Sequence, residues 1–113
     1  MSQLTTHILD TTLGRPAAGV AVALLAPAGP ADWRELAHGT TNADGRLTNL
    51  LPLGQRLAPG VYKLRFATGA YFERTSTPHF YPVVEICFTV ADEAHYHVPL
   101  LLNPFGYSTY RGS

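Results

Sequence analysis

The chain has 113 residues, of which 46% are hydrophobic and 14% charged, so we expect one folded domain over residues 1–113 rather than a disordered segment. Eight Lys and Arg residues balance eight Asp and Glu residues, which removes the electrostatic basis for a nucleic acid or anionic membrane partner. The single cysteine, Cys87, excludes an internal disulfide, and with no signal-peptide pattern at the start and no apolar run long enough to span a bilayer, we expect a cytoplasmic protein.

Short segments of alternating apolar and polar residues, separated by Gly- and Pro-rich stretches, predict an all-β protein. In chain order, strands are expected near residues 4–10, 20–24, 33–41, 61–68, 83–90, 95–102 and 107–110. NADGR, residues 42–46, contains an Asp-Gly pair suited to a tight hairpin turn, and NPFG, residues 103–106, predicts a second hairpin. Only residues 70–75 allow a single helical turn. This pattern favours a two-sheet antiparallel sandwich with an immunoglobulin-like outline and at most one short helix.

The sequence HYHVP places His95 and His97 on one face of a predicted strand. Paired imidazoles can bind a metal or move protons, but zinc needs a third protein ligand, and no HxxxH, CxxC or carboxylate cluster stands nearby in the sequence. We therefore expect no metal site. Two histidines on a solvated strand face remain the simpler alternative, and a third chemical group is needed to favour catalysis.

Candidates for this third group lie far away along the chain. His7, in LTTHILD, shares a strand face with Thr5 and Leu9. Arg46 closes the NADGR turn and Arg111 lies in the tail, but each can equally be an exposed arginine beside a loop. Composition and spacing thus indicate a small β-sandwich with an excess of His, Arg and Tyr near its ends, and no specific activity.

Five segments together resemble a known family. They run in order from residue 6 to residue 113 and cover nearly the whole chain: THILD, GRPAAGVAVAL, TNADGR, FYPVVEICF and HYHVPLLLNPFGYSTYRGS. They are similar to the 5-hydroxyisourate hydrolases, the transthyretin-related enzymes of urate breakdown. The terminal YRGS is the most specific match, because it separates these hydrolases from transthyretin, the hormone carrier that shares their fold.

This resemblance implies a transthyretin-like fold and hydrolysis of 5-hydroxyisourate to 2-oxo-4-hydroxy-4-carboxy-5-ureidoimidazoline, without a cofactor. It implies a homotetramer, a dimer of dimers whose edge strands extend the sheets. By residue-by-residue match, it implies the catalytic residues His7, Arg46 and His97, and the substrate-binding residues His7, Arg46, Tyr110, Arg111, Gly112 and Ser113. His95 has no family match, so we expect it to tolerate substitution better than His97.

Two other classes of function stay open at this level. A transthyretin-like carrier of small aromatic ligands would bind a ligand and leave 5-hydroxyisourate untouched. An immunoglobulin-like interaction domain would give the HYH pair and the YRGS ending no role. The residue types favour the hydrolase, because an imidazole accepts a proton from water near neutral pH and a guanidinium stabilises an oxyanion. Which of His7 and His97 is the base and which the acid stays open.

Overall fold

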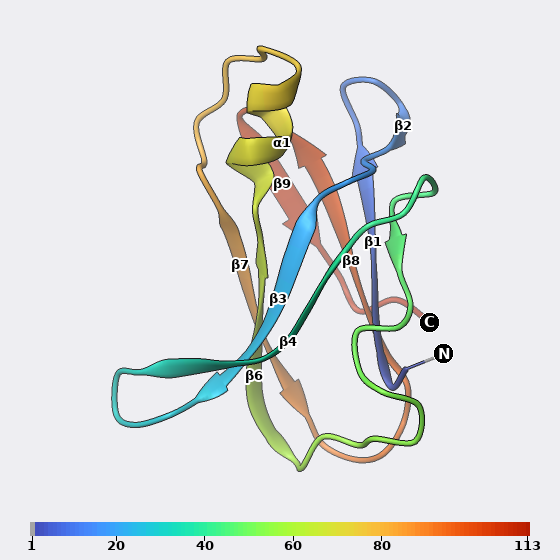
Figure 1. The fold of residues 1–113 in the computed structure, drawn as a ribbon, viewed down its shortest axis with the longest axis vertical. Helices are drawn as coiled ribbons and strands as arrows, with labels where there is room; N and C mark the ends of the chain where they lie inside the picture. The colour runs from blue at the N-terminus through green and yellow to red at the C-terminus, as the bar shows by residue number, and fades with distance from the viewer. Residues whose placement is uncertain (1) are drawn as a thin grey trace.

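The computed structural model describes residues 2–113. Its nine strands form two packed sheets, and one helix lies between two of the strands in the chain (Figure 1). The first sheet contains β1 (Leu4–Asp10), β2 (Arg15–Pro16), β5 (Arg46–Leu47), β8 (Tyr96–Asn103) and β9 (Gly106–Thr109). The second sheet contains β3 (Ala21–Pro27), β4 (Trp33–Thr40), β6 (Gly60–Phe66) and β7 (Val84–Val90). The predicted all-β, two-sheet sandwich is confirmed.

One strand pairing differs from the expected antiparallel arrangement. β1 and β8 run parallel, with Thr5 opposite His97 and His7 opposite Pro99, whereas the other strand pairs of residues 2–113 are antiparallel. Turn residues predict which neighbouring segments form hairpins, but they carry no information on a pairing between the two ends of the chain. This parallel pair places β1, which carries His7, beside β8, which carries His97.

Period-two alternation sorts the side chains of the first sheet into an inner and an outer face. The inner face packs against the second sheet in one hydrophobic core, to which β8 contributes Tyr96, Val98, Leu100 and Leu102. The intervening residues of β8, and Thr5, His7 and Leu9 of β1, therefore belong to the outer face. His7 and His97 are only half-buried there.

The NADGR segment makes a turn, but the predicted hairpin is wrong. The turn carries the chain from β4 of the second sheet to β5, which pairs with β1 of the first sheet. Asn42 Oδ1 accepts hydrogen bonds from the backbone N–H groups of Asp44 and Arg46. Gly45 has φ of +71°, and a Cβ there would lie 2.5 Å from the carbonyl oxygen of Ile8. The turn thus requires glycine and fixes the position of Arg46.

NPFG forms the second expected turn. β8 and β9 pair as an antiparallel hairpin from Asn103 opposite Gly106 to Leu100 opposite Thr109. Asn103 Oδ1 accepts a hydrogen bond from the Phe105 N–H at 2.9 Å, which stabilises the turn. The predicted hairpin is confirmed, and it starts the C-terminal tail along the edge of β8.

The helix α1 (Thr68–Arg74) is longer than the single turn expected over residues 70–75. Its Tyr71 hydroxyl donates a hydrogen bond of 2.8 Å to Asp10 Oδ2, and Asp10 is buried at the end of β1. Burial, followed by the Asp10 carboxylate, raises the pKa of Tyr71 to about 12. This contact ties the helix to the first sheet. No helix within residues 2–113 is long and apolar enough to cross a membrane.

Removing the Tyr71 hydroxyl should therefore destabilise the fold. We expect Tyr71→Phe to lower the free energy of unfolding by about 1–3 kcal/mol, because it leaves a buried carboxylate oxygen of Asp10 without that donor. Urea denaturation followed by circular dichroism measures the change. Tyr107→Phe, on the exposed edge strand β9, is the matched control, with an expected change within roughly 0.5 kcal/mol. Equal effects of the two variants would contradict the prediction.

Candidate active site

The outer face of the first sheet brings His7, Arg46 and His97 together from three strands. His7 of β1 lies directly opposite Arg46 of β5. On the other side of β1, His97 of β8 lies opposite Thr5, two residues before His7. The two histidines are therefore neighbours on adjacent strands, although they stand near opposite ends of the sequence.

The charge of Arg46 reaches both imidazoles. Burial, followed by the Arg46 guanidinium, lowers the pKa of His7 below 6.5, against the opposing influence of Asp44. Burial and then Arg46, with smaller contributions from His95 and His7, also lower the pKa of His97 below 6.5. Both rings are therefore kept neutral near neutral pH, the form that accepts a proton. Arg46 itself provides a cation beside them that can stabilise an oxyanion.

The Thr5 hydroxyl forms a hydrogen bond with Nδ1 of His97. Its Oγ1 lies 2.8 Å from Nδ1 of His97 and 2.9 Å from Nε2 of His95, and the Thr5 side chain is buried. The two imidazoles lie nearly parallel, with their centroids 6.3 Å apart. Sequence reasoning missed Thr5 as a functional residue. The spacing of Thr5 and His7, two residues apart on one strand, could have indicated its role, because it places the Thr5 hydroxyl on the same strand face as the His7 imidazole.

Gly112 closes the opposite edge of the His97 ring. Its N–H donates a hydrogen bond of 2.8 Å to the His97 carbonyl oxygen. A Cβ on Gly112 would lie 2.5 Å from His97 Cδ2, which is closer than side-chain atoms approach one another. Thr5 and Gly112 thus flank the two ring edges nearest the backbone, and Nε2 is left at the free end of the imidazole.

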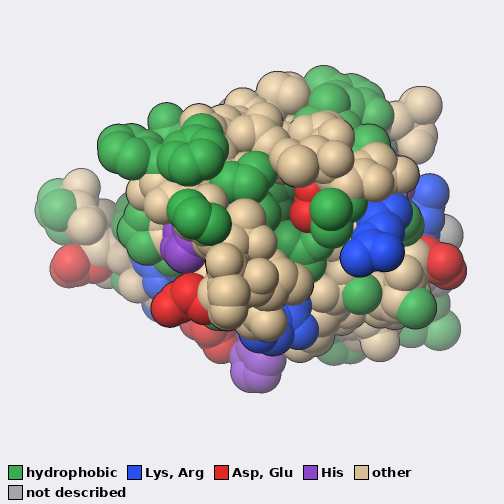
Figure 2. Space-filling view, turned by 90° about the horizontal axis from the view of Figure 1, so that it is seen from above, with side chains coloured by type: hydrophobic (Ala, Val, Ile, Leu, Met, Phe, Trp, Pro, Cys, Tyr) green, Lys and Arg blue, Asp and Glu red, His purple; other side chains and the backbone are tan. Residues whose placement is uncertain are grey.

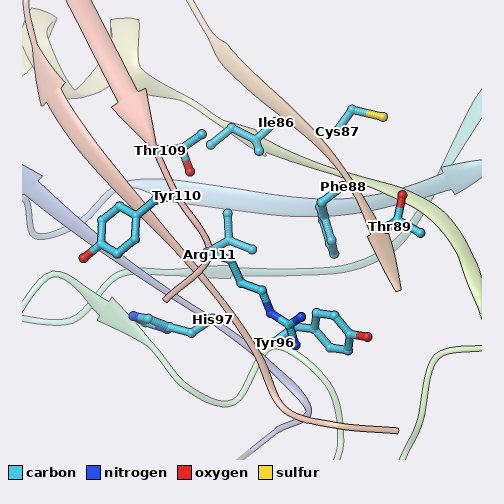
Figure 3. A pocket seen from close by; sticks show the side chains of 10 residues that line it. Ile86, Cys87, Phe88, Thr89, Tyr96, His97, Thr109, Tyr110 and Arg111 are labelled. Carbon is cyan, nitrogen blue, oxygen red and sulfur yellow. The ribbon is translucent and has the colours of Figure 1, made fainter. Parts of the chain in front are cut away.

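The side chains of Tyr110 and Arg111 in the tail point in different directions. Figure 3 shows the Tyr110 ring on the same side as the His97 imidazole, whereas the Arg111 side chain turns toward Tyr96. The Arg111 guanidinium lies 4.4 Å from the centre of the Tyr96 ring. Ser113 is exposed. Of the predicted site residues, the single chain gathers His7, Arg46, His97, Tyr110 and Gly112, and it directs Arg111 elsewhere.

The site on the outer face is not enclosed by one chain. A pocket of about 340 Å³ lies between β7, β8 and the tail, and His97, Tyr110 and Arg111 are among its lining residues (Figure 3). His7 and Arg46 do not line it. The pocket therefore reaches only one margin of the histidine and arginine cluster, and the remainder of the cluster faces outward from the sheet.

The described histidines are not arranged as a metal centre. Within residues 2–113, no group of three or more His, Cys, Asp or Glu side chains is placed to hold a metal ion. His95 and His97 approach each other through the Thr5 hydroxyl. The chemistry that this arrangement supplies is therefore proton transfer between imidazoles and a hydroxyl, beside a fixed guanidinium.

Comparison with known proteins identifies the family. The model of the HIUase/Transthyretin family matches residues 4–112. The chain belongs to this family. It is 50% identical to the 5-hydroxyisourate hydrolase of Caulobacter vibrioides over 119 residues, which cover 100% of both sequences. The resemblance to 5-hydroxyisourate hydrolases inferred from the five sequence segments is confirmed.

Solved structures of a 5-hydroxyisourate hydrolase and of a transthyretin share the fold of this chain. The 5-hydroxyisourate hydrolase of Klebsiella pneumoniae superimposes with a TM-score of 0.85 and 41% identity, covering 97% of this chain and 98% of that one. Sea bream transthyretin in complex with thyroxine superimposes with a TM-score of 0.89 and 34% identity, covering 98% and 95%. Since both share the fold, the fold alone does not decide between the two functions.

Proposed function

We propose that this protein hydrolyses 5-hydroxyisourate, opening its six-membered ring to give 2-oxo-4-hydroxy-4-carboxy-5-ureidoimidazoline. The observation that carries the proposal is the gathering of His7, His97 and Arg46 on one sheet face, where burial and then the Arg46 charge lower the pKa of both histidines. Two neutral bases beside a cation suit the attack of water on an amide carbonyl. Relatives named 5-hydroxyisourate hydrolase, one of them 50% identical over the full chain, support the same reaction.

In the proposed mechanism, water attacks the ring carbonyl carbon and one imidazole accepts its proton. The carbonyl oxygen becomes an oxyanion, which the Arg46 guanidinium stabilises by charge and hydrogen bonds. The tetrahedral intermediate collapses, the C–N bond breaks, and an imidazolium returns a proton to the departing ring nitrogen. His7 and His97 both start neutral, so one of them accepts the proton from water and the imidazolium that forms supplies the proton to the departing nitrogen, directly or through the other ring. Tyr110 lies beside His97 and is placed to orient the flat substrate.

We further propose a homotetramer, a dimer of dimers that covers the site and brings the remaining tail residues to it. β7 and β9 are edge strands of the two sheets, with free backbone groups that a second copy can pair. Exposed aromatic side chains lie at the start of these edges: Tyr81 packs edge-on against Phe80 and Tyr107, and the Phe80 N–H donates to the Pro104 carbonyl, next to the exposed Phe105. Figure 2, which views this end of the molecule, shows hydrophobic side chains gathered on it. Light scattering of the purified protein tests the association state.

We also propose a cytoplasmic location. Cys87 is the one cysteine of the sequence and lies exposed on β7 as a free thiol. Exposed free thiols persist in reducing compartments, where disulfides are rare. Fractionation of cells that make the protein tests this location, and recovery from an oxidising compartment would contradict it.

A direct assay separates hydrolysis from ligand carriage. Uricase converts urate to 5-hydroxyisourate, and the loss of its ultraviolet absorbance is followed with and without this protein. We expect a faster loss, unchanged after exhaustive chelation, because the imidazoles and the guanidinium supply the proton transfer and charge stabilisation. Binding of aromatic ligands with no acceleration would instead favour a transthyretin-like carrier.

The lowered pKa values of His7 and His97 predict a pH dependence. Each imidazole acts as a base only when neutral, so activity should fall as pH drops through the lowered pKa, and the acid limb should lie below pH 6.5. Arg46→Gln removes one cause of the lowering, so both pKa values should rise. NMR titration of the imidazole resonances measures them in wild type and variant. Values above 6.5 in wild type, or unchanged values in Arg46→Gln, would contradict this account.

A further inference from the structure

The Thr5 hydroxyl bridges two histidines with a single proton. Its oxygen lies within hydrogen-bonding distance of Nδ1 of His97 and of Nε2 of His95. A hydroxyl donates one hydrogen bond and can accept two, and within residues 2–113 the Thr5 hydroxyl has no hydrogen-bond partner besides these two rings. The arrangements that use its proton therefore have Thr5 donate to one ring nitrogen and accept an N–H from the other. The tautomers of the two histidines are therefore linked through this hydroxyl.

Only two arrangements of neutral rings satisfy both contacts and use the Thr5 proton. In the first, Thr5 donates to His97 Nδ1, so the proton of His97 sits on Nε2 and that nitrogen cannot act as a base. In the second, His97 Nδ1–H donates to Thr5, Thr5 donates to His95 Nε2, and the lone pair of His97 Nε2 is free. The second arrangement is the one that leaves His97 able to take a proton from water.

The backbone of Thr5 favours this arrangement. Burial and then Arg46 lower the pKa of His97, whereas a hydrogen bond with the Thr5 backbone opposes them. A backbone group that raises the pKa of an imidazole is an acceptor, so it stabilises a proton on the ring nitrogen that faces it. Thr5 faces the Nδ1 edge of His97, and Gly112 covers the Cδ2 edge. The Thr5 backbone therefore favours a protonated Nδ1, and the Thr5 hydroxyl can accept its hydrogen bond.

We propose that Thr5 and His95 form a proton relay that holds His97 with Nδ1 protonated and Nε2 free, and that carries a proton from His97 toward solvent. This inference rests on the proposed hydrolysis and assigns the base in it to His97. Thr5 and His95 act through His97 as positioning residues, without contact to the reacting atoms. The exposed ring of His95 gives the buried hydroxyl of Thr5 a path to water.

The proton count of the relay balances. When His97 Nε2 takes a proton from the attacking water, the ring becomes an imidazolium that still donates Nδ1–H to Thr5. That Nδ1 proton can pass to the Thr5 oxygen while the Thr5 proton passes to His95 Nε2. His97 is then neutral with its proton on Nε2, and His95 is the imidazolium. His95 releases its proton from Nδ1 to solvent or buffer. When the C–N bond breaks, His97 gives its Nε2 proton to the departing ring nitrogen, the His95 Nε2 proton returns through Thr5 to His97 Nδ1, and His95 takes a proton from solvent at Nδ1, which restores the starting tautomers.

NMR of the imidazole nitrogens tests the tautomer without any substrate. In protein with ¹⁵N-labelled histidine, at a pH above the pKa values of the rings, we expect His97 predominantly with Nδ1–H. Thr5→Val should abolish this preference, and Thr5→Ser should keep it. Thr6→Val is the matched control, because the Thr6 hydroxyl donates to the Val98 carbonyl on the inner face of the same strand. A predominant Nε2–H form in wild type, or no change in Thr5→Val, overturns the proposal.

Kinetics of the same variants test the relay in turnover. We expect Thr5→Val to lower kcat about tenfold with KM changed by less than about twofold, and Thr5→Ser to restore kcat to within about threefold of wild type. His95→Gln should lower kcat about threefold and recover with added imidazole buffer. Failure of Thr5→Ser to restore kcat, or equal losses in Thr5→Val and Thr6→Val, overturns the relay. Wild type that leaves 5-hydroxyisourate untouched refutes the proposed function instead, and the NMR result stands independently.

Discussion

Replacing His97, Arg46 or His7 by alanine is expected to reduce the turnover of 5-hydroxyisourate by about a hundredfold or more. His97→Ala and His7→Ala each remove a proton carrier. Arg46→Ala removes the cation that, after burial, lowers the pKa of both imidazoles and would leave the oxyanion without its counter charge. Steady-state kinetics with freshly generated 5-hydroxyisourate measure the loss. His97→Ala should give the clearest result, because this ring lies against both the Thr5 hydroxyl and Gly112 of the tail.

Matched variants on the second sheet separate a catalytic effect from a general loss of structure. His38 is exposed on β4 and pairs with Glu35, and Arg34 is exposed on the same strand. His38→Ala and Arg34→Ala should keep activity within about twofold of wild type. Circular dichroism and the unfolding midpoint should show that all the variants fold. Full activity in His97→Ala would refute the assignment of this residue.

The fold was largely predictable because its signals are local. Period-two alternation located the long strands within one or two residues, except that β3 ends at Pro27, three residues beyond the predicted end, and the turn residues of NPFG gave the β8–β9 hairpin. The Asp-Gly pair of NADGR predicted the turn but not its partner, since β5 pairs with β1 and not with β4. The parallel pairing of β1 with β8 depends on contacts between the chain ends, which alternation does not encode.

The candidate site was predictable only through the family. Alternation placed His95 with His97 and Thr5 with His7, but nothing in the spacing showed that these two strands are neighbours. The parallel register of β1 and β8 is what puts Thr5 beside His97. The resemblance to the family predicted that His7, Arg46, His97 and the tail are functional residues. Measurements on variants of these residues test this prediction. The resemblance did not predict Thr5, whose role rests on its two contacts with imidazole nitrogens.

Deleting Tyr110 to Ser113 is expected to leave a folded protein that hydrolyses 5-hydroxyisourate roughly tenfold more slowly or worse. Tyr110 is 58% exposed, and the tail contributes little to the core, so the fold should survive. The deletion removes the Gly112 hydrogen bond to His97, uncovers the Cδ2 edge of the ring, and takes away the Tyr110 side chain beside it. Turnover and association state are measured together on the truncated chain.

Point variants of the tail show which of these losses matters. Gly112→Ala keeps Tyr110 and Arg111 but puts a methyl group where His97 Cδ2 lies 2.5 Å away, so it should displace the imidazole and reproduce much of the loss in turnover. Arg111→Ala leaves the His97 ring undisturbed and removes only the contact with Tyr96. If Arg111→Ala lowers activity in an intact tetramer, Arg111 acts at the site, through the pocket that it lines with His97 and Tyr110 or across an interface with another chain. Activity retained in a truncated, intact tetramer would show that the tail is dispensable, whereas joint loss of activity and tetramer would place its role in assembly.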